Sequence, residues 1–387
     1  MHFFQNISNN INGDYMNFNS LNKRNIDYKI IIPLIIFCII SVTSIYSSSE
    51  LLSIHYNNLF IKQIIWYCIG FILIKLIMKI DLEVIFKHIN ILYIIGNVLL
   101  ALVLIFGTQS NGAKCWFSIP GIGSFQPSEF VKIILILMLA KELNKYEKSK
   151  KNFINEFKII LRCLIITLIP SILIFLEPDT GMIFIFFSIL IIMLFIYGIR
   201  YRWFAIMLSI TLIFLIIFFT LFFNYQETFI NLFGTNFFYR IDRLLDWKNG
   251  SGMQLTNALA ANGSAGLFGY GFRKTPIYFP EPHTDFIFSV FCSNFGFILS
   301  MLLILTIAYF DFRIIHISSN LQLKYKLILI GIFAMLLFQQ IQNIGMNIGL
   351  LPITGITLPF ISYGGSSLIS YMILIGIILN IQRKYCK

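Results

Sequence analysis

The sequence predicts an all-α integral membrane protein of about ten transmembrane helices, with both termini cytoplasmic and a large extracytoplasmic loop between the seventh and eighth spans. Three observations lead to this prediction. Of the 387 residues, 58% are hydrophobic and only 12% are charged, whereas a soluble domain has about 25% charged residues. The mean hydropathy is +0.82. The apolar residues also fall into runs of roughly 20, the length that a helix needs to cross a bilayer.

Apolar runs between polar breaks predict the individual spans. These runs cover residues 28–47, 59–78, 89–106, 128–143, 159–176, 182–198, 204–223, 285–310, 327–345 and 362–381. Residues 1–27 are rich in Asn and lack the apolar core of a signal peptide, so we expect a disordered cytoplasmic tail before an uncleaved first span. Residues 28–382 are expected to form one polytopic membrane domain, with the large loop at 224–284.

The basic residues set the predicted orientation. The chain has 29 Lys and Arg against 17 Asp and Glu, a formal charge of +12. Such an excess can indicate nucleic-acid binding, but membrane proteins also keep Lys and Arg in their cytoplasmic loops. With the N-terminus inside, most of the basic residues fall in cytoplasmic segments. We therefore interpret the charge as an orientation signal and expect no nucleic-acid partner.

The fourth predicted span begins with two charged residues. In the stretch QPSEFVK, Glu129 and Lys132 are three residues apart and share one face of the helix. Charges at this depth are costly and face each other or a polar cavity. The pair is therefore either a local ion pair that anchors the helix end, or it places Lys132 in a cavity that receives an anionic group.

A second polar break precedes the sixth span. In EPDTG, residues 177–181, Pro178 interrupts the helix and Asp179 can cap the start of the next one. A cap is a sufficient explanation for this carboxylate. Its position also allows Asp179 to pair with Lys132, which we state as a prediction.

Three further blocks lie before or among the last three spans. Residues 253–272 are rich in Gly but lack a following GK[ST], which excludes a P-loop and leaves a flexible re-entrant segment as one interpretation. After them, Asp285 lies at the membrane boundary, two residues after His283. It is either a helix cap or a base acting on a lipid-linked substrate. Near the last span, Ser366 lies among small residues that either line a site or pack helices closely.

These blocks, in this order, resemble the SEDS family, the shape, elongation, division and sporulation proteins. The resemblance extends from about residue 30 to 382. It depends on QPSEFVK (126–132), EPDTG (177–181), HTDFIF (283–288) and PFISYGGSS (359–367). One departure is the sequence Lys114-Cys115-Trp116, where many members have Arg directly before the Trp.

The resemblance implies a peptidoglycan glycosyltransferase that polymerises lipid II, the undecaprenyl-diphosphate-linked disaccharide pentapeptide, into β-1,4-linked glycan at the outer face of the cytoplasmic membrane. By resemblance, Asp285 matches the catalytic aspartate, and Glu129, Lys132, Asp179 and Ser366 match cavity residues. The implied partners are a class B penicillin-binding protein transpeptidase and other elongation-complex membrane proteins. The stretch 119–129 is more similar to the rod-shape, RodA-like members, with division (FtsW-like) and sporulation types as alternatives.

The chemistry of glycan polymerisation assigns further roles. A base must take the proton of the acceptor hydroxyl, and Asp285 suits this role, with His283 as a neighbouring cavity residue. The leaving diphosphate needs positive charge, and a divalent cation, Mg²⁺ or Mn²⁺, is a candidate cofactor. The candidate side chains for this charge are Lys132, Lys114, Arg240, Arg243 and Arg273. A single displacement would invert the anomeric carbon.

Two other functions compete with this one. A lipid II flippase would use the same cavity without making a bond, but it needs polar groups that continue to the cytoplasmic half of the spans. The charged motifs here gather at the outer rim. A non-catalytic scaffold for the transpeptidase is the third possibility, and both rivals predict no product from the purified chain and lipid II.

Overall fold

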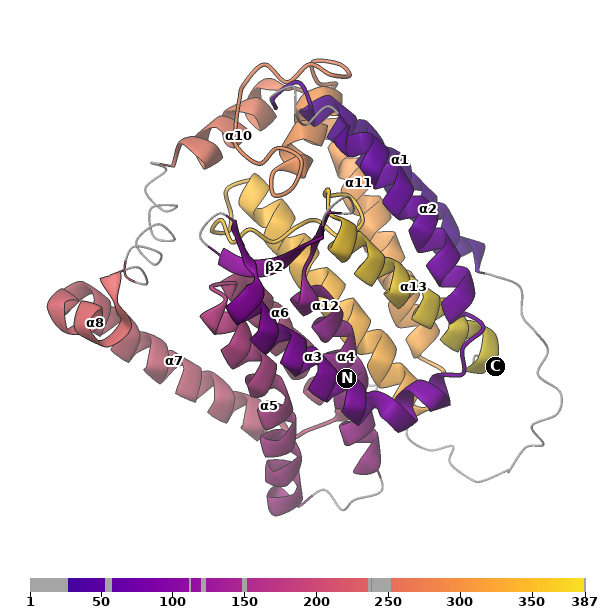
Figure 1. Ribbon diagram of the computed structural model, residues 1–387, viewed down its shortest axis with the longest axis vertical. Helices are drawn as coiled ribbons and strands as arrows, with labels where there is room; N and C mark the ends of the chain where they lie inside the picture. The colour runs from indigo at the N-terminus through magenta and orange to yellow at the C-terminus, as the bar shows by residue number, and fades with distance from the viewer. Residues whose placement is uncertain are drawn as a thin grey trace.

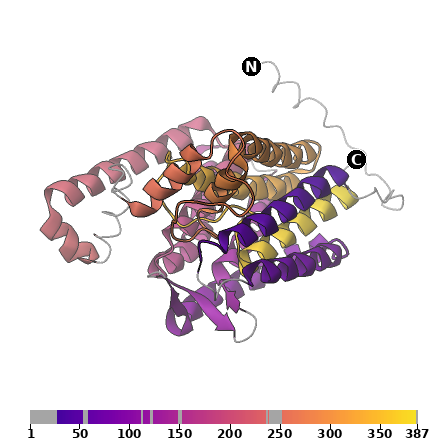
Figure 2. The same ribbon diagram turned by 90° about the horizontal axis from the view of Figure 1, so that it is seen from above.

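The protein is a helical bundle from which α7 and α8 extend to one side (Figures 1 and 2). The computed structural model describes residues 27–52, 58–110, 113–119, 123–147, 152–235, 238 and 252–385. The predicted tail, apart from Asp27, lies outside the described residues, and so do Arg240 and Arg243.

The long helices follow the order of the predicted spans. They are α1 (Tyr28–Ser48), α2 (Leu59–Ile77), α3 (Leu82–Phe106), α4 (Pro127–Lys145), α5 (Phe153–Leu176), α6 (Thr180–Tyr197), α7 (Tyr201–Asn224), α11 (Ile287–Ser318), α12 (Leu323–Asn347) and α13 (Gly365–Tyr385). Among the described residues, 9 of these are long and apolar enough to cross a membrane. The shorter α8 (Gln226–Phe233) and α10 (Met253–Ser264) lie in the large loop.

Helix α4 is the remaining span, and it is the one that carries charge. It packs against α3, α5, α6, α12 and α13, and both Glu129 and Lys132 are buried. Protein rather than lipid therefore surrounds these charges, which is the arrangement that makes them tolerable at membrane depth. The predicted multi-pass helical fold is confirmed.

A small sheet at the outer side adds to the helical fold. Strands β1 (Thr108–Ser110), β2 (Ala113–Ile119) and β3 (Gly123–Phe125) form an antiparallel sheet in the order β1-β2-β3. The register pairs Thr108 with Trp116 and Phe117 with Phe125. No strands were predicted for this stretch, although it contains Gly and Pro residues of the kind that separate short strands.

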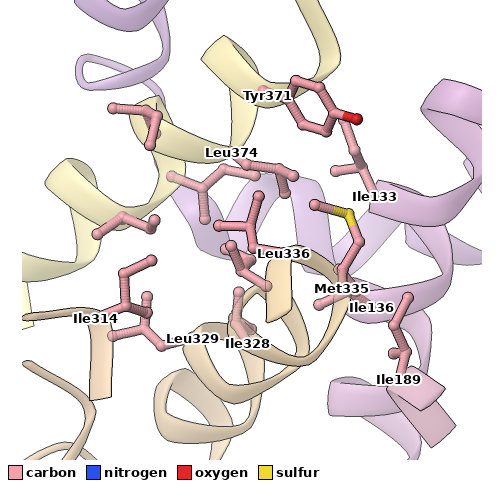
Figure 3. Close-up of a cluster of buried hydrophobic side chains, with 14 of the residues drawn as sticks. Ile133, Ile136, Ile189, Ile314, Ile328, Leu329, Met335, Leu336, Tyr371 and Leu374 are labelled. Atoms are coloured by element: carbon pink, nitrogen blue, oxygen red, sulfur yellow. The ribbon is translucent and has the colours of Figure 1, made fainter. Parts of the chain in front are cut away.

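The apolar core lies where α4, α6, α11, α12 and α13 meet. Figure 3 shows part of it, with Ile136, Ile189 and Leu336 packed together from three of these helices. Helix α7 contributes little, since Trp203 and Phe222 are its buried side chains among those described. Hydrocarbon solvates apolar side chains about as well as a protein core does, so such a helix can remain apart from the bundle.

Both ends of the helical region meet on one face. Asp27, which precedes α1, accepts hydrogen bonds from Arg313 of α11 and from Gln382 of α13, each at 2.7 Å. An even number of spans returns the chain to the side where it began. The contact therefore agrees with the prediction that both termini share the cytoplasmic side.

Helix α11 is broken at its outer end. Gly296 has non-helical angles (φ 74°, ψ −173°) inside the helix, so the N–H groups after the break lack helical partners. Phe297 and Ile298 instead donate to the carbonyls of Gly266 and Leu267, at 3.0 and 3.2 Å. A segment of the large loop therefore caps the membrane-spanning half of α11.

The same loop also satisfies the helix before the break. The N–H groups of Tyr270 and Gly271 donate to the carbonyls of Ser293 and Asn294, at 2.9 and 3.0 Å. Residues 266–271, which we call the capping segment, thus bond to both sides of the break. The end of the Gly-rich stretch is therefore held against α11 by main-chain bonds.

Gly269 is expected to be required for this contact. Its φ is +77°, and a Cβ atom there would meet the backbone of Asn294 and Gly296. Gly269→Ala should lower the melting temperature in detergent, because the left-handed conformation alone costs about 1–2 kcal/mol for a residue with a Cβ. Gly263→Ala is the matched control. A Cβ at Gly263 in α10 would meet nothing within 4 Å, and alanine there should stabilise by about 0.5–1 kcal/mol. Equal melting temperatures for the two variants would contradict the assignment.

Candidate functional site

A cavity of about 590 Å³ lies at the outer ends of the helices. Its walls come from α2, the sheet, the starts of α4 and α6, the segment before α11, and residues 354–367. The titratable residues that line it are Lys62, Cys115, Glu129, Asp179, Glu281, His283, Asp285 and Tyr363. The four predicted motifs therefore converge on one cavity, although they are far apart in the sequence.

Asp285 is held in the cavity through its main chain. Its carbonyl oxygen accepts hydrogen bonds from the side-chain amides of Asn343 and Asn347, at 3.0 and 2.9 Å. The Asn347 side-chain oxygen in turn accepts from the N–H and hydroxyl of Ser289, at 3.1 and 2.7 Å, at the start of α11. Two side chains on the last turns of α12 thus fix both the residue and the helix that follows it.

The Asp285 carboxyl is suited to exchange protons near neutral pH. Burial, and then the nearby charge of Glu281, raises its pKa to about 7. Glu281 itself is fixed by the Thr284 hydroxyl, which donates to it at 2.9 Å. Gly355 lies against the carboxyl, since a Cβ there would be 3.8 Å from Asp285 Oδ2. A glycine at this point leaves space beside the acid.

His283 lies on the same loop and also lines the cavity. Burial lowers its pKa, while the charge of Glu281 acts in the opposite direction. Its carbonyl accepts a hydrogen bond from the N–H of Tyr363, at 2.9 Å, which ties the loop to the segment before α13. The ring therefore adds little positive charge to the site at neutral pH.

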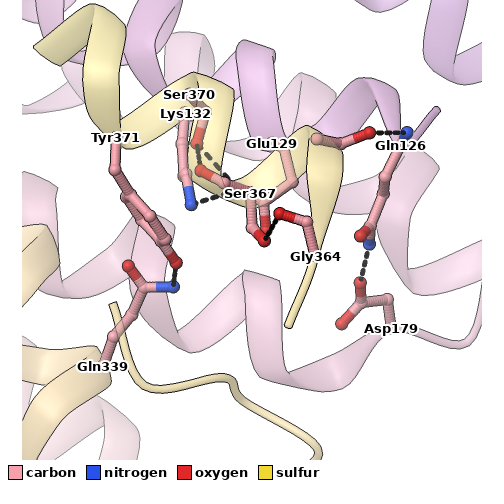
Figure 4. Close-up of polar contacts among 10 residues, drawn as sticks. Gln126, Glu129, Lys132, Asp179, Gln339, Gly364, Ser367, Ser370 and Tyr371 are labelled. Carbon is pink, nitrogen blue, oxygen red and sulfur yellow. Dashed lines mark hydrogen bonds and ion pairs between the residues drawn. The ribbon is translucent and has the colours of Figure 1, made fainter. Parts of the chain in front are cut away.

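Lys132 lies beneath the cavity in a polar network (Figure 4). Its buried ammonium pairs with Glu129 and lies 4.4 Å from the centre of the Tyr371 ring. Glu129 also accepts a hydrogen bond from Ser370 at 3.0 Å, and Gln339 donates to the Tyr371 hydroxyl at 3.0 Å. Glu129 faces the cavity, so the pair joins its floor to α12 and α13.

Asp179 caps α6, as expected. One carboxylate oxygen accepts from the N–H of Met182 at 3.2 Å, and the other accepts from the Gln126 side chain at 3.1 Å. Burial raises the pKa of Asp179 to about 6. The predicted ion pair of Asp179 with Lys132 is wrong, because among the described ion pairs Lys132 pairs with Glu129. Their i, i+3 spacing already brings this carboxylate to the amine.

Ser366 joins two walls of the cavity. Its hydroxyl accepts from the N–H of Gln126 at 3.1 Å and donates to the carbonyl of Ser124 at 3.0 Å. It therefore connects the start of α13 to β3 and to Gln126, the residue directly before α4. The predicted position in the cavity lining agrees with this structure.

Lys114 points away from the cavity, which corrects its predicted place there. Its ammonium donates to the carbonyls of Leu104 and Ile105, both at 2.9 Å. These carbonyls belong to the last turn of α3, where helical partners are missing and a cation is stabilised by the helix dipole. Capping α3 is therefore what Lys114 does in this structure.

Arg273 is also engaged elsewhere. It donates to the Tyr46 hydroxyl at 2.9 Å, lies 4.5 Å from the centre of that ring, and is 3.6 Å from Glu50. These contacts place it at the outer end of α1 and outside the cavity lining. The structure therefore does not bring Arg273 to the position predicted for the diphosphate.

Several residues in or next to the cavity were not predicted from the sequence. Lys62 lines the cavity from the first turn of α2, and Glu281, Asn343 and Asn347 position or neighbour Asp285. A charge near the outer start of an apolar span is itself a signal, because such charges seldom face lipid. Nothing in the spacing of the two asparagines indicates that they hold a distant loop.

The Glu129–Lys132 pair should matter more for stability than an exposed pair. Glu129→Ala leaves a buried, uncompensated ammonium, and breaking such pairs costs about 3–5 kcal/mol. The matched control is Glu142→Ala, which removes the partner of Arg162, whose side chain is 52% exposed, and should cost less than about 1 kcal/mol. Thermal unfolding in detergent compares the two. A larger loss for Glu142→Ala would contradict the buried pairing.

Comparison with known proteins identifies the family that has this architecture. The model of the FtsW/RodA/SpoVE family, described as cell cycle protein, matches residues 26–387. A relative from Hydrogenovibrio crunogenus, named probable peptidoglycan glycosyltransferase FtsW, is 34% identical over 93% of this chain and 92% of its own. Stage V sporulation protein E of Bacillus subtilis is 33% identical over 93% of this chain and 98% of its own.

Solved structures agree with the sequence relatives. A chain from a structure described as "Structural coordination of polymerization and crosslinking by a peptidoglycan synthase complex" is 26% identical, with a TM-score of 0.75, over 92% of this chain and 98% of that one. The rod shape determining protein RodA of Thermus thermophilus is 26% identical, with a TM-score of 0.67, over 95% and 99%. The chain belongs to the FtsW/RodA/SpoVE, or SEDS, family, and it is a multi-pass glycosyltransferase of the cytoplasmic membrane.

Proposed function

We propose that this glycosyltransferase polymerises lipid II into β-1,4-linked peptidoglycan strands at the outer face of the membrane. The observation that supports this most is the Asp285 carboxyl, which faces an outward cavity and has a pKa of about 7. A general base is most effective when its pKa is near the working pH. The names of the relatives, several of them peptidoglycan glycosyltransferases, support the choice of substrate.

In the proposed reaction Asp285 takes the proton of the acceptor sugar's 4-hydroxyl. The hydroxyl oxygen bonds to the anomeric carbon of the donor as the bond from that carbon to the diphosphate oxygen breaks. The diphosphate leaves with the bonding electrons, and the proton remains on Asp285. One displacement inverts the carbon, so an α-linked donor gives a β-link. Correct placement of the two sugars supplies much of the rate.

The leaving diphosphate needs cations on the opposite side of the reacting carbon. We propose Lys62 for this role, because it lines the cavity and no described acidic residue forms an ion pair with it. Lys132 adds a second positive charge beneath the floor, partly offset by Glu129. The predicted roles of Arg240 and Arg243 stay predictions, since both lie outside the described residues.

Mg²⁺ or Mn²⁺ stays a candidate cofactor. The described residues hold no group of three His, Cys, Asp or Glu side chains placed for a metal. Magnesium is commonly bound by one or two carboxylates together with substrate phosphates and water. Glu129 and Asp179 line the cavity and are the carboxylates we propose for such an ion, which would neutralise charge on the diphosphate.

A lipid II flippase is the alternative from another class. Its headgroup path would need polar groups that continue toward the cytoplasm. The cavity is lined by the outer parts of the spans, and beyond the Glu129–Lys132 network the buried cluster in Figure 3 consists mainly of Ile, Leu and Met side chains. This arrangement supports bond formation at the outer face over passage through the bundle.

The biological role within the family is open between three types. The stretch 119–129 predicts an elongation role in cell shape, like that of RodA. The curated relatives named above, FtsW and stage V sporulation protein E, are 34% and 33% identical, against 26% for the RodA structure. We therefore propose a division- or sporulation-type role as the second candidate.

The same comparison supports a transpeptidase partner. The similar chain with a TM-score of 0.75 comes from a peptidoglycan synthase complex whose structure is described as a structural coordination of polymerization and crosslinking. We propose that this chain works with a class B penicillin-binding protein, and with other membrane proteins of the elongation complex if its role is in cell shape.

Replacing the proposed base should abolish polymerisation. Purified Asp285→Ala in nanodiscs should form glycan from lipid II at least about 10²-fold more slowly, the usual effect of losing a general base. Glu50→Ala is the control, since Glu50 is an outer carboxylate that contacts Arg273 outside the cavity, and it should retain activity. Wild-type glycan yield from folded Asp285→Ala would rule out the base. No product from the wild-type chain, with or without a transpeptidase, would favour the flippase or scaffold.

The pH dependence tests the environment of the base. Because the pKa of Asp285 is raised to about 7, the active, deprotonated carboxylate forms as pH rises, and activity should increase through about pH 7. Glu281→Gln removes a negative charge that raises this pKa, so the increase should move to lower pH. The rate of glycan formation from pH 5 to 9 measures both. A shift to higher pH in Glu281→Gln would contradict the account.

A further inference from the structure

The capping segment exposes an apolar tip at the outer end of the bundle. Phe268 is 78% exposed and Leu267 is 58% exposed. Both belong to the large loop, which a hydropathy reading assigns to water. A soluble loop rarely presents two large adjacent apolar side chains without a partner.

The main-chain bonds fix the depth of this tip. Because Ile298 donates to the carbonyl of Leu267, the tip lies directly on the first turn of the membrane-spanning half of α11. Asn294, just before the break, donates to Ser47 in the last turn of α1 at 2.7 Å. The tip is therefore level with the outer ends of two spans, which is where the hydrocarbon region meets the headgroups.

The exposed apolar surface continues from the tip onto α11. Phe297, Ile298 and Leu302 are exposed on the first turns after the break, as expected for a helix side that faces lipid. At this depth the capping segment pairs part of its main chain with both sides of the break. Irregular backbone at membrane depth needs such internal pairing.

Charge is distributed as an interfacial segment requires. The chain from residue 252 to 272 has no charged residue, and Arg273 and Lys274 follow it directly. Lys274 is exposed. Its N–H group donates a hydrogen bond to the carbonyl of Gly271, which holds the residue next to the capping segment. An apolar and aromatic tip beside a cation matches the residues that hold proteins at a lipid headgroup level.

We propose that Leu267 and Phe268 insert into the outer leaflet and anchor the catalytic loop at the membrane interface, with Lys274 contacting lipid phosphates. The occupant of this surface is the lipid of the bilayer. The capping segment leads within a few residues to the loop that carries Asp285. The anchor therefore holds the proposed base at the level where the headgroup of a lipid-linked substrate emerges from the bilayer.

The test measures tryptophan fluorescence of Phe268→Trp in full-length protein reconstituted in nanodiscs. The fluorescence of the four native tryptophans is measured in the parent protein and subtracted. Lipids brominated near the top of the acyl chains should reduce the added fluorescence about twofold or more, because interfacial side chains lie about 5–10 Å into the headgroup and acyl boundary. Acrylamide in the water should quench it weakly. Because Phe268 is exposed, the variant should fold as the parent does, and thermal unfolding checks this.

Leu267→Asp and Leu267→Met, each combined with Phe268→Trp, form the matched pair. The carboxylate should withdraw the tip and reduce quenching by brominated lipid about twofold or more, whereas Met should leave it unchanged. Strong acrylamide quenching without lipid quenching would overturn the proposal. Protection of the added tryptophan from acrylamide that depends on protein concentration would also overturn it, because the tip would then contact a second copy of the chain. No substrate is used, so failure here is distinct from failure of the proposed catalysis.

Discussion

The site depends on two asparagine side chains at the outer end of α12. Asn343 and Asn347 hold the main-chain carbonyl of Asp285, and Asn347 also holds Ser289 at the start of α11. Buried side-chain amides are almost always hydrogen-bonded in folded proteins, so burial favours these bonds. They couple the position of the proposed base to a helix that is buried over most of its length, rather than to the loop in which the base lies. The position of Asp285 is therefore fixed by the helical bundle, although the residue itself lies in a loop.

The membrane explains the rest of the arrangement. Helix α4 brings Glu129 and Lys132 to the cavity floor only because five other helices enclose it, and lipid would not solvate these charges. Helix α11 can break at Gly296 only because the capping segment satisfies the freed groups. The charged groups are therefore concentrated at one end of the bundle, where water, substrate headgroup and protein meet.

Much of this was predictable from the sequence, and the exceptions have physical reasons. Hydropathy gave the spans because the bilayer fixes their length, and the motifs around Glu129, Asp179 and Asp285 converge as predicted. The contacts of long side chains were not predictable. Lys114 binds main-chain carbonyls and Arg273 contacts an aromatic ring, and neither side chain reaches the cavity. The pairing of Lys132 with Glu129 is the one that the i, i+3 spacing of a helix predicts. Lys62 lines the cavity together with residues that are distant in sequence, the two asparagines contact a distant loop, and no local sequence pattern indicates either arrangement.

The most direct test of the account is the kinetic effect of Asn343→Ala on glycan formation from lipid II in nanodiscs. The variant keeps the carboxyl of Asp285 and the cavity cations but releases one bond that positions the base. The account predicts that kcat falls by about 10²-fold, the cost of a misplacement of about 1 Å, while KM stays near the wild-type value. A folded variant with wild-type kcat would contradict the claim that α12 positions the base.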